Sequence, residues 1–102
     1  MNRQTKFTAI SPETKEAVYC RDEGYCVHCG KWVPPFYACA HFIPRARGGL
    51  GIEQNILTLC PECHRRYDQG ICRKEYEAEF EEYLKSKYPN WNREELVYRW
   101  GM

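Results

Sequence analysis

The pattern of hydrophobic and polar positions along this 102-residue chain is clearest near its C-terminal end. The segment from Cys72 to Lys87 places aromatic and aliphatic side chains at helical spacing, and Pro89 follows it. This spacing predicts an amphipathic helix that packs through one face. Asn92 with Glu95 fits a capping pattern and predicts a last helix that packs back. The side chains expected to pack are Tyr76, Phe80, Tyr83, Leu84, Leu96, Val97 and Trp100.

A second helix is predicted near the N-terminus. Ser11 is a favourable N-cap residue, and Pro12 fits the first helical position, where its missing N–H has no partner to lose. We expect this helix to run to about Asp22 and to stop at Gly24. Residues 1–10, which precede it, are mostly polar and are expected to form a loose segment.

The middle of the chain predicts short strands and one more helix. Two stretches, Phe36–Phe42 and Asn55–Leu59, suit strands, and they flank a basic, glycine-rich loop at residues 45–51. A helix is expected to begin at Pro61, where proline is tolerated, and to end by Gly70. The order of elements therefore predicts a small α+β fold.

Composition limits the class of protein. Hydrophobic residues make up 43% of the chain and charged residues 28%, which excludes wholesale disorder, and the length suits one domain. No apolar run approaches the ~20 residues that span a bilayer, and the N-terminal residues lack the apolar core of a signal peptide. We expect a soluble cytoplasmic protein with no membrane partner, in a bacterial or phage-infected host cell.

Seven cysteines are many for a chain of this length. Four of them form two C-x-x-C pairs, Cys26 with Cys29 and Cys60 with Cys63, which is zinc-ligand spacing. The odd number of cysteines argues against a disulfide framework. The pairs predict a closed tetrahedral Zn²⁺ site whose role is structural, because four thiolates leave no position open for substrate. Cys20, Cys39 and Cys72 are expected to be buried thiols.

A second set of residues carries different chemistry. His41 and Asn55 lie between the two cysteine pairs, and His64 directly follows Cys63. Asp68 lies four residues beyond His64, so the two side chains share one helix face and can bind one divalent cation.

His41, Asn55 and His64 lie within two stretches, AHFIPRARGG from Ala40 and EQNILTLCPECH ending at His64. Together these stretches resemble the HNH endonuclease family with its ββα-metal fold. The resemblance implies that His41 is the general base and that His64 is a metal ligand. It implies that Asn55 fixes the loop between the strands, or reaches the metal. The family usually places Asp or His where this chain has Ala40. Asp68 occupies a position where some relatives carry a further metal-binding His.

The resemblance predicts a metal-dependent DNA endonuclease or nickase from a phage, mobile-element or restriction setting, with catalytic residues His41, Asn55 and His64. The catalytic ion is expected to be Mg²⁺ or Mn²⁺, with Ni²⁺ or Zn²⁺ as further candidates. Residues 11–102 would form one nuclease domain, with a motif core at 26–70 and C-terminal helices at 72–102. Residues 41–74 carry six basic and three acidic side chains, which favours DNA as partner. The predicted DNA-binding residues are Arg45, Arg47, Arg65 and Arg66.

Several alternatives remain open from sequence. His41 can be a structural histidine, His64 a fourth zinc ligand, Asp68 a surface acid, and Arg45 and Arg47 solvated loop charges. The chain can also be an inactive zinc-stapled nucleic-acid-binding module, with Ala40 as the sign of lost catalysis. A third function is a structural zinc protein that docks a partner through its acidic C-terminal helices. A nuclease this small has little surface for reading bases, so a partner protein or homodimer is expected to supply specificity.

Overall fold

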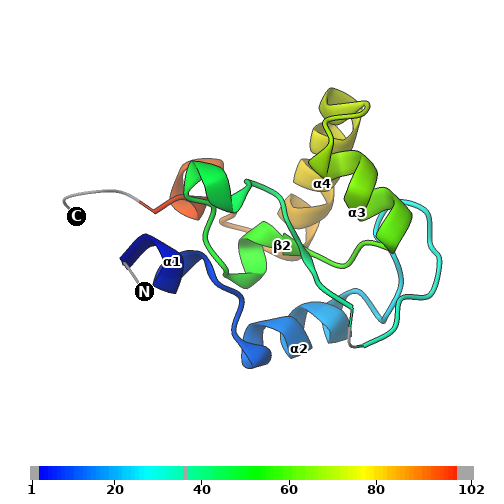
Figure 1. The fold of residues 1–102 in the computed structure, drawn as a ribbon, viewed down its shortest axis with the longest axis horizontal. Helices are drawn as coiled ribbons and strands as arrows, with labels where there is room; N and C mark the ends of the chain where they lie inside the picture. Colours follow the sequence, from blue (N-terminus) through cyan, green and yellow to red (C-terminus); the bar gives the residue numbers. More distant parts are fainter. Residues whose placement is uncertain (1–2, 36, 99–102) are drawn as a thin grey trace.

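A small antiparallel sheet lies at the centre of the fold. The computed structural model describes residues 3–35 and 37–98. In Figure 1, helix α2 lies on one side of the sheet, and helices α3 and α4 lie on the other. The elements, in chain order, are α1 (Arg3–Thr8), α2 (Pro12–Arg21), β1 (Ala40–His41), η1 (Arg45–Arg47), η2 (Glu53–Asn55), β2 (Ile56–Leu57), α3 (Pro61–Asp68), α4 (Arg73–Lys87) and η3 (Arg93–Leu96). This arrangement confirms the predicted small α+β class with a β1–β2–α3 centre. No helix in the described ranges is long and apolar enough to cross a membrane.

Helix α2 begins and ends where the sequence predicted. The Ser11 Oγ accepts a hydrogen bond from the Thr14 backbone N–H at 3.1 Å, and Pro12 occupies the first turn. Asp22 is the C-terminal cap, and Gly24 follows with a φ of 76°. The left-handed conformation begins one residue earlier, at Glu23 with a φ of 56°, where the helix has ended, and Gly24 adopts it without strain.

The N-terminal segment differs from the expectation that residues 1–10 are loose. Arg3–Thr8 form helix α1, and Thr8 is only 2% exposed. The Phe7 carbonyl accepts a hydrogen bond from the Gly51 N–H at 3.0 Å. A contact with a segment more than forty positions away orders these residues, and local sequence carries no signal for it.

The strands are shorter than predicted. Ala40 pairs with Leu57 and His41 with Ile56, so each strand has two residues. Pairing stops because the chain turns into η1 beyond Pro44, and because η2 immediately precedes Ile56. Phe36, the expected start of the first strand, lies outside the described residues.

The C-terminal elements pack into the larger of two core clusters. Helix α4 buries Tyr76, Phe80 and Leu84 on one face, as the spacing predicted. The Tyr67 ring of α3 packs edge-on against Phe80, with 5.2 Å between ring centroids. The expected last helix is a four-residue 3-10 turn, η3, in which the Asn92 side chain accepts from the Glu94 N–H and Leu96 is buried. Trp100 lies outside the described residues.

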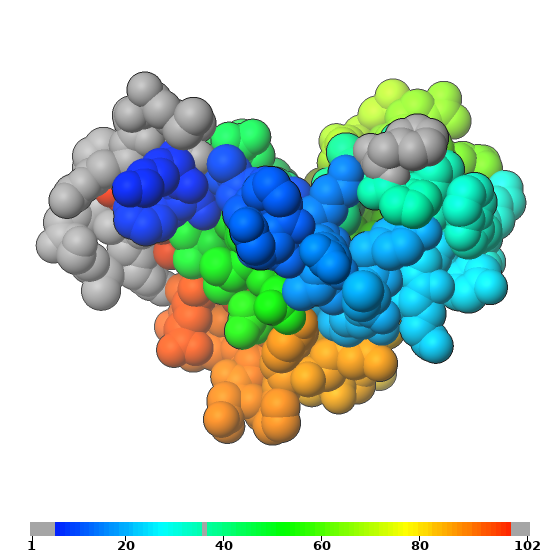
Figure 2. Space-filling view, turned by 90° about the horizontal axis from the view of Figure 1, so that it is seen from below, coloured from blue at the N-terminus to red at the C-terminus, as the bar shows by residue number. Residues whose placement is uncertain are grey.

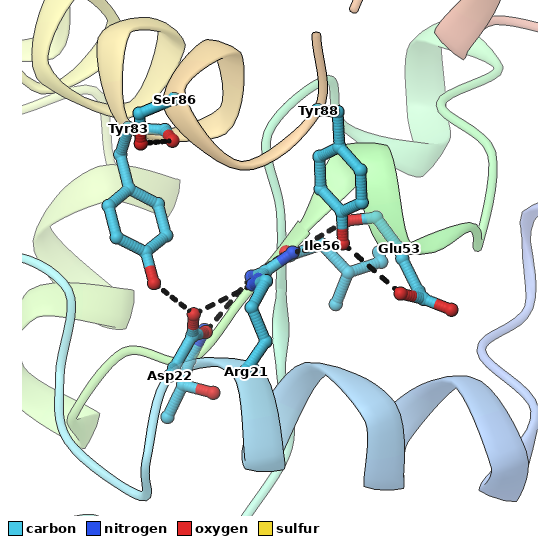
Figure 3. A network of polar contacts seen from close by, with 8 residues as sticks. Arg21, Asp22, Glu53, Ile56, Tyr83, Ser86 and Tyr88 are labelled. Carbon is cyan, nitrogen blue, oxygen red and sulfur yellow. Dashed lines mark hydrogen bonds and ion pairs between the residues drawn. The ribbon is translucent and has the colours of Figure 1, made fainter.

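A buried charge network connects α2 with β2 and α4 (Figure 3). Arg21 binds the Asp22 carboxylate through two N–H groups, at 2.8 and 2.9 Å, and its side chain is 10% exposed against 1% for Asp22. The same guanidinium donates to the Ile56 carbonyl at 2.7 Å and to the Tyr88 hydroxyl at 3.1 Å. The Tyr83 hydroxyl donates to Asp22, which completes the coordination of the buried carboxylate. A buried charge pair is tolerated when its remaining hydrogen-bonding groups are satisfied in this way.

We expect Arg21→Met to lower the free energy of unfolding by about 3–5 kcal/mol, because it leaves the Asp22 carboxylate buried without its cation. Chemical denaturation of the zinc-loaded protein measures the change. The matched control is Arg65→Met, an exposed arginine on α3, for which the expected change is within about 0.5 kcal/mol. Equal stability of the two variants would show that the network does not stabilise the fold.

Candidate active site

Four cysteine sulfurs converge beside the sheet. The Sγ atoms of Cys26, Cys29, Cys60 and Cys63 all lie within 4.8 Å of one another, and Cys29 Sγ lies 3.6 Å from Cys60 Sγ. Sulfurs bound tetrahedrally to zinc at about 2.3 Å are about 3.8 Å apart, so the spacing fits this ion. The backbone N–H groups of Cys29 and Cys63 point at the first sulfur of their own pair, both at 3.5 Å. The set is thus suited to a structural zinc ion, as predicted.

The other three cysteines do not share this site. All seven cysteines are free thiols in the structure. Cys39 is buried as expected, and burial raises the pKa of its thiol. The prediction of buried thiols is wrong for Cys20 and Cys72, which are exposed. On α2, Val18 faces the core, and Cys20 lies about 200° further around the helix, which turns it outward.

His41 is held by a backbone carbonyl. Its Nε2 lies 2.8 Å from the Thr8 carbonyl oxygen, which can only accept a hydrogen bond. Nε2 therefore carries the proton in the neutral ring, and Nδ1 carries the free lone pair. Burial is the main cause that lowers the pKa of His41 from its ordinary value of 6.5. The charges of Arg45 and His64 lower the pKa further, whereas the Thr8 hydrogen bond and Asp68 oppose the shift. The ring is therefore a neutral base at neutral pH.

Asn55 fixes the loop that follows His41. Its side chain is fully buried, and its Oδ1 accepts a hydrogen bond from the Ile43 N–H at 2.8 Å. Its amide nitrogen donates to the carbonyls of Ile43, at 3.2 Å, and Leu50, at 2.8 Å. The amide thus joins both ends of the basic loop, and both of its polar atoms take part in hydrogen bonds to the backbone.

His64 and Asp68 form a pair on the exposed side of α3. His64 Nε2 lies 3.3 Å from Asp68 Oδ2, close to the ~3 Å that separates neighbouring ligands in an octahedral Mg²⁺ shell. His64 Nδ1 is buried and has no hydrogen-bond partner among the described residues. The charges of both residues act on the pKa of His41, so the pair and the base lie near one another. Tyr37, which sequence reasoning did not single out, presents its ring edge-on to His64 at 5.9 Å.

Position 40 contributes no ligand. The Ala40 side chain is 1% exposed and belongs to the apolar core, and neighbouring strand residues such as His41 point to the opposite face. In the part of the chain that the structure describes, the cysteine set is the one group of three or more ligand-type side chains that converge. A cation at His64 and Asp68 would therefore complete its shell with waters and substrate oxygens, as Mg²⁺ commonly does.

The four predicted DNA-binding arginines occupy different places. Arg45 and Arg47 are exposed on η1, and Arg45 Nε donates to the Thr8 hydroxyl at 3.3 Å, beside the carbonyl that binds His41. Figure 2 shows a notch in the outline of the molecule, with blue and green segments on one side and teal and yellow-green segments on the other. Arg65 is exposed on α3. Arg66 lies about 200° around α3 from His64 and lines a separate 280 Å³ hollow with His28, so the structure does not bring it to the candidate site.

Comparison with known proteins agrees with this arrangement. The family model described as HNH endonuclease matches residues 25–70, which include both cysteine pairs, His41, Asn55, His64 and Asp68. This segment is an HNH endonuclease domain. The chain is also 29% identical over 100 residues to the type IV methyl-directed restriction enzyme EcoKMcrA of Escherichia coli, and the match covers 91% of the chain and 34% of that enzyme. It is 50% identical over 30 residues to anaredoxin of Nostoc sp., covering 29% of the chain and 40% of that protein. The chain thus matches well under half the length of both relatives.

We expect the purified protein to bind stoichiometric zinc, and we expect Cys29→Ser to lose it. Loss of an ion present at a thousandfold its Kd lowers the free energy of unfolding by about 4 kcal/mol. Metal analysis and denaturation measure both effects. Cys20→Ser, a matched change at an exposed cysteine outside the cluster, is expected to keep both zinc and stability. Retention of zinc by Cys29→Ser would contradict the four-sulfur site.

We expect the pKa of His41, measured by NMR titration, to lie below 6.5. The unfolded chain then binds a proton at His41 at a higher pH than the folded chain does. The contribution of the neutral His41 ring to the free energy of unfolding is complete above pH 6.5. It is lost as the pH falls from 6.5 toward the lowered pKa. Unfolding free energies of the parent and of His41→Gln should therefore converge as the pH falls through this window. A pKa above 6.5 would contradict the buried, neutral ring.

Proposed function

We propose that this chain is a metal-dependent DNA endonuclease or nickase that hydrolyses phosphodiester bonds with His41 as general base. The observation that carries the proposal is the hydrogen bond from His41 Nε2 to the Thr8 carbonyl. It leaves Nδ1 unprotonated on a ring whose pKa is lowered, in the neighbourhood of a histidine–carboxylate pair. The match of residues 25–70 to the HNH endonuclease family and the resemblance to a restriction enzyme support the same activity.

The base acts on water. Phosphodiester hydrolysis needs a nucleophile stronger than neutral water, and Nδ1 of His41 can accept the proton that water loses as it attacks phosphorus. The Thr8 carbonyl stabilises the imidazolium that results, because its hydrogen bond to Nε2–H becomes charge-assisted. The Asn55 amide keeps the following loop in a fixed position relative to the base.

His64 and Asp68 are the residues that would hold the catalytic cation, for which Mg²⁺ or Mn²⁺ is the proposed identity. When bound, such an ion supplies Lewis-acid stabilisation of charge on the phosphate and the leaving oxygen. The zinc ion at the four cysteines has a separate, structural role, since its ligand set leaves no open position.

DNA is the proposed substrate, and η1 is the proposed contact. Arg45 and Arg47 are exposed, and Arg45 binds Thr8 beside the base, so a phosphate held there would lie near His41. Arg65 extends this positive surface on α3, whereas Arg66 faces another part of the molecule. Contacts to phosphate carry no sequence information, so specificity would come from a partner subunit or a second copy of the chain.

A binding module without catalysis is the second candidate, and one observation favours it. Ala40 is buried in the core, which leaves two protein ligands for the catalytic ion. Such a module would bind DNA with an affinity that falls steeply as salt rises, and it would cut nothing with any divalent ion.

The test is nicking of supercoiled plasmid with Mg²⁺ or Mn²⁺, with EDTA as the metal-free control. We expect His41→Ala to slow cutting by roughly 10²- to 10⁴-fold, the usual contribution of a general base, and to keep its zinc and fold. His28→Ala is the matched control, because His28 pairs with Glu79 on α4 and takes no part in the proposed reaction. It should cut like the parent.

Cutting by His41→Ala at the parental rate would refute His41 as the base. DNA binding by the parent without cutting, under every divalent ion tried, would select the binding module.

A further inference from the structure

The carbonyl that binds His41 comes from outside the matched HNH domain. Thr8 ends helix α1 and lies 33 positions before His41. It also lies seventeen positions before residue 25, where the family match begins. Carbonyls in the last turn of a helix lack an intrahelical donor, so this one is available to an outside N–H group. Thr8 is 2% exposed, which removes most of the water that would compete for its carbonyl.

Gly51 allows this segment to approach the site. The Gly51 N–H donates to the Phe7 carbonyl at 3.0 Å, so the two backbones lie in direct contact. A Cβ at position 51 would lie 2.1 Å from the Ala9 carbonyl oxygen and 3.0 Å from that of Thr8. Both obstacles are backbone atoms, which cannot swing aside as the end of a side chain can. A larger residue at position 51 must therefore shift the backbone at Ala9, and its Cβ would also be in tight contact with the adjoining Thr8 carbonyl, which His41 binds.

We propose that residues 7–9 are a positioning segment for the general base, and that Gly51 is the residue that permits it. The inference rests on the proposed nuclease function and adds residues 7–9, which lie outside the family's matched segment. Through its carbonyl, Thr8 selects the Nε2–H form of His41, which turns the lone pair of Nδ1 toward substrate. Through its hydroxyl, Thr8 also binds Arg45, so one residue links the base with the proposed phosphate contact. Neither Thr8 nor Gly51 touches substrate in this role.

The test substitutes Gly51→Ala in the full, zinc-loaded chain and follows two readouts. Long-range ¹H–¹⁵N NMR reports which ring nitrogen of each of the three histidines carries the proton, without any need for activity. Plasmid nicking with Mn²⁺ gives kcat and KM. We expect the parent to show His41 protonated at Nε2, and Gly51→Ala to show a mixture of the two forms. We expect kcat to fall roughly 10- to 100-fold, part of the full contribution of a general base, with KM within about twofold.

The control is Lys6→Ala, an exposed residue of α1, which is expected to match the parent in both readouts. If Gly51→Ala does not fold, a chain that lacks residues 1–9 removes the carbonyl altogether and is read in the same way. A folded, zinc-replete variant that keeps the Nε2–H form, or that loses it without a fall in kcat, overturns the proposal. A parent that does not cut DNA refutes the nuclease function instead. In that case the NMR spectrum alone tests whether residues 7–9 position His41. Retention of the Nε2–H form in Gly51→Ala would overturn this positioning role, and loss of that form would support it.

Discussion

The convergence of four cysteine sulfurs is the constraint on which the rest of the structure depends. Cys29 and Cys60 are 31 positions apart, and both strands and the turns that connect them lie in this interval. Two-residue strands add few hydrogen bonds, so the sheet alone cannot hold the ends of this segment together. A zinc ion across the two pairs would close the loop and fix the start of α3, the helix that carries His64 and Asp68.

The Arg21–Asp22 network performs the equivalent task on the other side of the sheet. Arg21 reaches the carbonyls of Glu53 and Ile56, so it fixes the backbone on both sides of Asn55. Asp22 accepts from the Thr58 N–H at 3.0 Å, which extends the same contact along the chain toward Cys60. The segment that begins with the Asn55 amide and ends with the cysteine pair is thus held from two directions. A base and a cation pair that must face one phosphate gain from this rigidity, because small displacements cost large factors in rate.

Features set by local chemistry could be predicted from sequence, and features set by distant contacts could not. The cysteine spacing, the Ser11–Pro12 helix start and the apolar face of α4 depend on neighbours in sequence, and the structure contains all three. Helix α1 and the contact between Thr8 and His41 depend on a meeting of segments 33 positions apart, for which the sequence has no periodic signal. Among the described residues of the expected strand 36–42, only Ala40 and His41 pair, because β-propensity does not show how few residues will find a partner. The position of Arg66 beside His28, away from His64, follows from its register on α3, which a count of local charges ignores.

Under the proposed function, the general base is formed more completely in this structure than the cation site is. The base is complete without any ligand, since burial keeps His41 neutral and a backbone carbonyl sets its protonated nitrogen. The cation site has few protein ligands, because Ala40 packs in the core and supplies none, and the Asp68 side chain is 64% exposed. Two protein ligands, one of them exposed, hold a cation weakly in water, whereas a substrate phosphate adds both charge and oxygen ligands to the same place. The cation and the DNA would then each strengthen the binding of the other, and catalysis would depend on a base that is already oriented when they arrive.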